Sequence, residues 1–208
     1  YEPKGHKYIR DFETELLPKV SYRVGGVVLS TELLLVEKEN QVLLRYTLDE
    51  ANSPTTLRFR PYLAFRSVHQ LTHQNLEANT RFDKVENGIK LKLYESLPEL
   101  NMQLSKKSEF VPIPDWYRNI EYIKEYERGY DYLEDLYVPG YFEVSIEKGE
   151  SIIFSASTVE GKNSRLKNKF TREKSKRIPR DTLLNNLLNA AQQFILKKGE
   201  SSELVAGY

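Results

Sequence analysis

The chain has 208 residues, 39% of them hydrophobic and 29% charged, with a formal net charge of +1, which is typical of a globular domain. It contains no cysteine, which excludes a disulfide framework and a thiolate metal site. It has no apolar run of about 18 residues and no secretory signal, which argues against a membrane partner and favours a cytoplasmic location.

The chain from Ser21 to about Ser157 is expected to form one strand after another. Leu33–Val36 and Gln41–Leu48 are rich in β-forming residues, and a turn is expected between them. Gly25-Gly26 lies within an apolar stretch and lacks the pattern of a nucleotide-binding loop, so it indicates a bulge or a close backbone approach.

The clearest strand pattern runs from Thr56 to Arg66. Apolar residues such as Leu57 and Phe59 alternate along it with residues such as Arg58 and Arg60, as is typical of a strand with one buried face. Pro61 lies inside the pattern and predicts a sheet edge or a bulge.

Two turn signals predict β-hairpins. Asn87-Gly88 joins Arg81–Val85 to Ile89–Tyr94, and Lys148-Gly149 joins Tyr141–Ile146 to Ser151–Ser155. Many short strands separated by turns predict an all-β fold, a large antiparallel β-sandwich over residues 1–158.

Residues 159–178 are predicted to be a basic linker. Nine Lys or Arg residues and one Glu lie between Gly161 and Arg180, and this part of the chain shows no periodic pattern. A basic run can bind nucleic acid, but here only Phe170 offers a ring for base stacking. We therefore favour a solvated linker and predict no nucleic-acid partner.

The pattern changes to that of a helix within residues 179–208. Apolar residues recur there at helical spacing and form one stripe: Leu183, Leu184, Leu187, Leu188, Ala191, Phe194 and Ile195. Pro179 near the start and Gly199 after the end predict a single C-terminal helix from Asp181 to Lys198. The stripe needs a partner, either the sandwich or a helical domain outside this chain.

The segment Trp116–Gly140, here called the aromatic-acidic segment, contains seven aromatic rings among many charged residues. An exposed Trp116 beside Tyr117 would suit stacking on a sugar ring, whereas the one Trp of a sandwich also commonly packs in the core. The polar neighbours of Trp116 favour an exposed or interfacial position.

The acids of this segment include Asp131, Glu134 and Asp135. A glycosidase needs two carboxyls about 5–9 Å apart across one bond, and sequence neighbours seldom face each other in that way. The favoured interpretation is that the acids pair with basic residues such as Arg128 to order a loop. Alternatively, the loop reaches over a neighbouring active site and contacts substrate.

His69 and His73 have the i, i+4 spacing of a helical metal site, but no further ligand lies nearby and a surface turn is expected. The chain contains no nucleophilic serine motif, phosphate-binding loop or calcium loop. We predict no metal, no cofactor and no catalytic residue within this chain.

Three pieces of sequence resemble the N-terminal domain of the bacterial and archaeal glycogen debranching enzymes, the amylo-α-1,6-glucosidase family. The first is the aromatic-acidic segment, with its Trp-Tyr, Arg-Gly, Glu-Asp and Pro-Gly pairs. The second is Leu57–Leu71, in which Arg66 and His69 match an Arg-x-x-His turn. The third is Asn189–Tyr208, which is similar to a helix followed by an Ala-Gly-Tyr strand at the entrance of a catalytic domain.

The resemblance implies a super-sandwich placed before a catalytic barrel of paired helices, to which residues 179–208 would belong. The full-length enzyme would hydrolyse α-1,6-glucosidic branch points of glycogen and related α-glucans with carboxylates outside this chain, which we expect to be a fragment. The candidate contacts with substrate or with the barrel are Trp116, Tyr117, Arg128, Asp131, Glu134, Asp135, Arg66 and His69. Two alternatives stay open: a stand-alone module that binds glycogen or maltooligosaccharides, and a purely structural domain.

Overall fold

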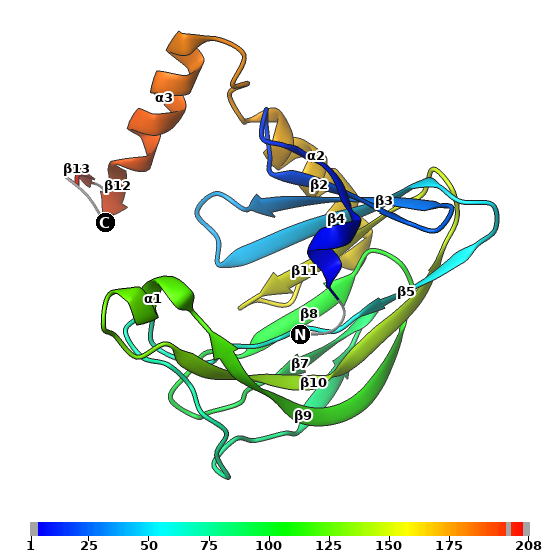
Figure 1. Ribbon diagram of the computed structural model, residues 1–208, viewed down its shortest axis with the longest axis vertical. Helices are drawn as coiled ribbons and strands as arrows, with labels where there is room; N and C mark the ends of the chain where they lie inside the picture. Colours follow the sequence, from blue (N-terminus) through cyan, green and yellow to red (C-terminus); the bar gives the residue numbers. More distant parts are fainter. Residues whose placement is uncertain (1–3, 199–200, 206–208) are drawn as a thin grey trace.

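The computed structural model describes residues 4–198 and 201–205, and it consists of two antiparallel β-sheets packed face to face, with helices at the periphery (Figure 1). The larger sheet has eight strands in the order β1-β2-β3-β4-β11-β8-β7-β6, and the smaller has three in the order β5-β10-β9. The prediction of an all-β sandwich is confirmed. The strands of the larger sheet are β1 (Ile9–Glu13), β2 (Lys19–Val24), β3 (Val27–Leu35), β4 (Gln41–Glu50), β6 (Phe82–Val85), β7 (Gly88–Leu91), β8 (Leu100–Leu104) and β11 (Ser151–Ser157).

Short turns connect some of the neighbouring strands of this sheet. β3 pairs with β4 across the predicted turn, and β6 pairs with β7 around Asn87, whose φ of 49° suits a hairpin turn. Gly25 and Gly26 form a two-residue turn, because Val24 pairs with Val27 across them. The expectation of a bulge within a strand was therefore wrong, and the positive φ of Gly25, 56°, explains the glycine.

The smaller sheet consists of β5 (Thr55–Phe59), β10 (Leu133–Ile146) and β9 (Glu109–Glu121). β5 is an edge strand, and its ladder with β10 ends at Phe59, two residues before Pro61. The alternation of more and less exposed residues nevertheless continues to Phe65, and Leu63 forms an isolated bridge with Tyr137. The sequence pattern thus correctly predicted the faces, while Pro61, which lacks an N–H group, lies beyond the end of the ladder.

The core lies between the two sheets. The ring of Phe154 contacts those of Phe59 and Phe142 there, with centroid distances of 5.8 and 5.6 Å. Each sheet contributes every second residue of its strands to this layer, as sandwich packing requires.

The predicted hairpin across Lys148-Gly149 does not form. β10 pairs with β5 and β9, whereas β11 pairs with β4 and β8, so the chain crosses from one sheet to the other at this turn. The alternating residues of both strands predicted two half-buried strands correctly. The predicted pairing of the two strands with each other was wrong. Two half-buried strands can bury their apolar faces in opposite sheets of a sandwich as well as side by side in one sheet, and the sequence pattern does not distinguish the two arrangements.

The predicted basic linker contains the short 3₁₀ turn η2 (Asn163–Arg165) and the helix α2 (Leu166–Ser175). Leu166 and Phe170 are buried against Leu34, Leu43 and Ile153 on the outer face of the larger sheet. The expectation of an irregular solvated segment was therefore wrong. Two buried apolar residues four positions apart were enough to attach the helix, too few to stand out among the lysines and arginines.

Ion pairs and a stacked ring fasten α2 further. The guanidinium of Arg45 lies 4.7 Å from the ring centroid of Phe170 and pairs with Glu32, which also accepts a hydrogen bond of 2.7 Å from Lys174. Burial disfavours ionisation of Glu32, but the hydrogen bonds from Lys174 and Arg45 outweigh it and lower the pKa of this carboxyl.

The predicted C-terminal helix is shorter than expected. α3 spans Leu183–Gln193 and is capped by the side chain of Thr182, which accepts a hydrogen bond from the Asn185 N–H. β12 (Ile195–Lys198) and β13 (Ser201–Leu204) follow as a small antiparallel pair. The expected start of a strand at Ala206–Tyr208 lies outside the described residues.

Two further short elements complete the fold, η1 (Gly5–Tyr8) and α1 (Ile123–Glu127), so more than the one predicted helix is present. None of the helices in the described part of the chain has the length and apolar character needed to cross a membrane.

We predict that Phe170→Ala lowers the free energy of unfolding by about 3–5 kcal/mol, because it removes a fully buried ring between α2 and the sheet. Asn168→Ala, at an exposed position of the same helix, should change stability by less than about 0.5 kcal/mol. Denaturant unfolding of both variants measures this. Equal effects of the two substitutions would show that α2 is not docked as described.

Candidate functional site

The aromatic-acidic segment forms the long β9–β10 hairpin together with its connection. Trp116 pairs with Tyr137, Glu121 pairs with Leu133, and α1 fills the loop between the strands. The Tyr122 N–H donates to the Tyr132 carbonyl over 2.9 Å and closes the base of this loop. Residues distant within the segment are thereby brought side by side on one edge of the sandwich.

Glu134 is the buried anchor of this edge, with none of its surface exposed. Its carboxylate pairs with the Arg66 guanidinium and accepts hydrogen bonds from the Tyr122 hydroxyl at 2.6 Å and the Thr72 N–H at 3.1 Å. Burial disfavours the charge, but the hydrogen bonds from Arg66, Tyr122 and Thr72 prevail and lower the pKa of Glu134. The network fastens the turn that follows Arg66 to β10.

Asp135 fastens the same turn from the other side of β10. Its carboxylate accepts hydrogen bonds of 2.9 Å from the N–H groups of Gln74 and Asn119, and its own N–H donates to the Thr72 carbonyl. Burial opposes ionisation here too, yet the backbone hydrogen bonds from Gln74 and Asn119 lower the pKa of Asp135. The structure therefore brings three predicted site residues together: Arg66, Glu134 and Asp135.

Trp116 is buried, with 9% of its surface exposed, and its ring meets that of Tyr137 edge-on at 5.6 Å within the sandwich core. The interpretation of an exposed or interfacial Trp was therefore wrong. Its polar neighbours were misleading because adjacent residues of a strand point to opposite faces, so that Asp115 and Tyr117 are exposed while Trp116 is not.

Tyr117 is exposed on the outer face of the smaller sheet. Its ring meets the ring of Tyr62 edge-on at 5.0 Å, beside a small hollow. Tyr62 was not among the candidate residues from sequence. Its place on the polar side of the Thr56–Arg66 alternation was the signal that could have identified it.

The remaining candidates do not join the Glu134 network. Arg128 pairs with Glu125 at 3.2 Å and stacks on Tyr130, and Asp131 is exposed. His69 lies exposed in a turn rather than on a helix. Within residues 4–198 and 201–205, no group of three or more His, Cys, Asp or Glu side chains is arranged to hold a metal ion.

Apolar side chains are exposed on both sides of the Glu134 network. Val68 and Leu76 lie on the tethered segment after Arg66, and Ile123, Tyr126 and Tyr130 lie on α1 and the turn that follows it. These exposed apolar side chains are candidates for contact with another protein surface.

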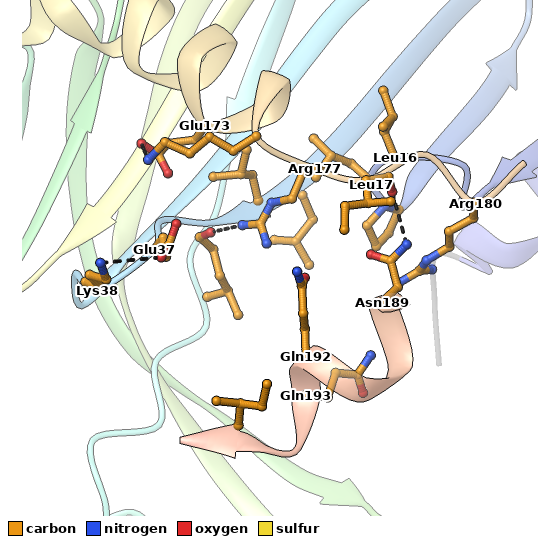
Figure 2. A pocket seen from close by; sticks show the side chains of 17 residues that line it. Leu16, Leu17, Glu37, Lys38, Glu173, Arg177, Arg180, Asn189, Gln192 and Gln193 are labelled. Carbon is orange, nitrogen blue, oxygen red and sulfur yellow. Dashed lines mark hydrogen bonds and ion pairs between the residues drawn. The ribbon is translucent and has the colours of Figure 1, made fainter. Parts of the chain in front are cut away.

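A second candidate surface lies around α3. A groove of about 710 Å³ separates this helix from the end of β3 and from the segment after α2 (Figure 2). The amides of Asn189, Gln192 and Gln193 face the groove, and the Asn189 side chain donates to the Ile178 carbonyl at 3.1 Å (Figure 2). On the groove's other wall, Leu33 and Leu35 are exposed.

The leucine stripe of α3 is exposed in the described part of the structure. Leu183, Leu184, Leu187 and Leu188 are between 44% and 78% exposed, on the side of the helix opposite the amides. An amphipathic helix normally turns its apolar stripe to the core, and α3 turns its polar side to the domain instead.

One family comparison matches this chain. The family model described as "Glycogen debranching enzyme N terminal" matches residues 1–153, which include both sheets except the last strand positions of β11. A search of curated proteins found no match.

We predict that Glu134→Gln lowers the free energy of unfolding by about 3 kcal/mol, because it leaves the partly buried Arg66 without its counter-charge. Glu127→Gln, which removes an exposed carboxylate paired with Lys124 on the same short helix, should change stability by less than about 1 kcal/mol. Denaturant unfolding at neutral pH measures both, and similar losses for the two variants would contradict an anchoring role for Glu134.

The stabilisation by Glu134 should depend on pH. Because its pKa is lower in the folded than in the unfolded chain, the stabilisation is complete above the ordinary value of 4.5 and is lost as pH falls through the lower folded pKa. We therefore expect the stability difference between the wild type and Glu134→Gln to be constant above pH 5 and to shrink below about pH 4.5. A difference that grows on acidification would contradict the assigned network.

Proposed function

The chain belongs to the glycogen debranching enzyme N-terminal family, and we propose that it is the non-catalytic N-terminal domain of an enzyme that hydrolyses α-1,6-glucosidic branch points of glycogen and related α-glucans. In this proposal the domain supports the catalytic domain and helps to hold the glucan. The observation that carries it is the outward-facing leucine stripe of α3, combined with the family match.

The titration behaviour of the acids supports a non-catalytic role. Glycoside hydrolysis requires a carboxylic acid that is still protonated near neutral pH, which means a raised pKa. Where the pKa of a described carboxyl departs from its ordinary value, it is lowered, as for Glu134 and Asp135. Both acids are occupied in fastening the turn after Arg66, which leaves them unsuited to donate a proton to a glycosidic oxygen.

The composition of α3 supports docking against a catalytic domain. Residues 182–196 contain no charged side chain, although a helix exposed to water usually carries charges on its outer face. Its amide side borders the groove, so the leucine side is free to pack against a helix of the catalytic domain. The exposed rings of Tyr126 and Tyr130 at the aromatic-acidic edge offer a second contact of the same kind.

A stand-alone glucan-binding module is a second candidate. The exposed Tyr62–Tyr117 pair favours it, because rigid tyrosine rings provide a contact surface at low entropic cost. The leucine stripe of α3 speaks against it, since a free-standing module would leave this stripe in water.

We predict that Leu187→Asp has opposite consequences in two contexts. In the 208-residue chain it should change the free energy of unfolding by less than about 0.5 kcal/mol, because Leu187 is 59% exposed. In the intact enzyme the carboxylate would be buried at the domain junction, and we expect a loss of at least about 2 kcal/mol together with reduced release of glucose from branched glucan.

Gln192→Glu is the matched control, because it adds the same charge at an exposed position on the amide side of α3. It should leave both proteins unchanged. If Leu187→Asp is equally silent in the intact enzyme, α3 is not a docking helix. If the 208-residue chain alone releases glucose from branched glucan, the proposed non-catalytic role is wrong.

A further inference from the structure

The outer face of the smaller sheet carries a hollow of about 130 Å³ that faces away from the sandwich core. Its lining includes Arg60, Tyr62, Asp115, Trp116, Tyr117 and Gly140. These residues come from three adjacent parts of the fold: the extension of β5, the middle of β9 and the bulged part of β10.

A break in strand register creates the hollow. The pairing of β9 with β10 shifts between Val138 and Gly140, where Gly140 has a φ of 146°. A Cβ atom at this position would lie 2.1 Å from the carbonyl oxygen of Val111, so only glycine fits. Gly140, the last residue of the aromatic-acidic segment, thereby lines the hollow together with the buried Val138.

The aromatic wall is held in place before any ligand arrives. Tyr62 and Tyr117 are 45% and 37% exposed, and their edge-on contact fixes both rings. A ring fixed in this way can pack against the C–H face of a sugar with little loss of side-chain entropy.

The polar wall offers a donor and an acceptor. The Arg60 guanidinium makes no ion pair or hydrogen bond with any residue in the described ranges 4–198 and 201–205, whereas its neighbour Arg58 pairs with Glu143 at 2.7 Å. The Asp115 carboxylate accepts a hydrogen bond of 2.7 Å from the Trp116 N–H, which orients it beside the hollow, and lies 3.6 Å from Arg118.

We propose that this hollow binds one glucosyl unit of an α-glucan chain. The sugar ring packs against the Tyr62–Tyr117 pair, Arg60 donates hydrogen bonds to its hydroxyl oxygens, and Asp115 accepts them from its hydroxyl groups. Among the lining residues one Arg and one Asp balance each other, which suits a neutral polyhydroxyl ligand better than an anion.

The size of the hollow limits the ligand. Pockets for drug-sized ligands measure about 300–1,000 Å³, so this smaller hollow takes a single ring and leaves the rest of a chain on the surface. That the ligand is a sugar follows from the lining. That it belongs to an α-glucan rests on the proposed function.

Calorimetric titration measures occupancy directly, whereas the Trp116 ring packs on Tyr137 in the core and is not aimed at the ligand. We expect maltoheptaose at millimolar concentration to bind the 208-residue chain saturably. Tyr62→Ala and Arg60→Ala should each weaken binding about tenfold, whereas Tyr62→Phe should retain most of it, because the ring contact is kept.

Tyr126→Ala is the matched control, since Tyr126 is also an exposed tyrosine in an edge-on pair, with Tyr132, but lies outside the hollow. It should bind maltoheptaose as the wild type does. Unchanged affinity of Tyr62→Ala, or no response of the wild type, overturns the proposal. An equal response to cellohexaose, which is β-linked, overturns its assignment to α-glucans.

These outcomes are separable from those for the proposed function. If Leu187→Asp disrupts the intact enzyme but maltoheptaose does not bind the 208-residue chain, the domain docks and the hollow is not a sugar site. If maltoheptaose binds while Leu187→Asp is silent, the hollow is a sugar site on a protein organised differently from the proposal.

Discussion

The turn at Lys148-Gly149 is the constraint on which the sandwich depends. It takes the chain from the central strand of the smaller sheet, β10, to an interior strand of the larger sheet, β11. The two strands carry Phe142 and Phe154 into one core, so the two sheets must stack face to face. Reciprocal backbone hydrogen bonds with Leu48, of 2.7 Å from Gly149 and 3.1 Å to Glu150, hold the crossing in place.

The two proposed contact surfaces lie beside the part of β10 that precedes this crossing. Glu134 fastens the start of β10 to the segment after Arg66, which orders the exposed apolar residues beside α1. Its bulge at Gly140 opens the hollow on the outer face. β10 therefore contributes its inner side chains to the core. Its buried acid and its register break shape the two surfaces that we propose contact a protein partner and a sugar.

The two main helices show how local amphipathicity and tertiary docking differ. α2 has a weak apolar stripe, yet Phe170 is fully buried and Arg45 stacks on it, so the helix belongs to this domain. α3 has a strong leucine stripe, yet its polar side faces the groove and Leu187 is exposed. An apolar stripe indicates that a helix packs against another surface, but only the tertiary structure shows whether that surface belongs to the same domain.

The sequence by itself determined the β-sandwich class, the faces of Thr56–Arg66, the Asn87-Gly88 hairpin and the existence of a C-terminal helix, because periodicity and turn chemistry are local properties. It also marked the family, through motifs that the family comparison supports. Only the tertiary structure decided that the strands on either side of Lys148-Gly149 join different sheets and that Trp116 faces the core. It also brought Glu134 to Arg66, which lies 68 residues away in the sequence. These depend on contacts between distant segments, whose energies no local pattern records. The alternation of Thr56–Arg66 placed Tyr62 and Arg60 on the outer face, but only the assembled sheet brought them beside Tyr117 and Asp115.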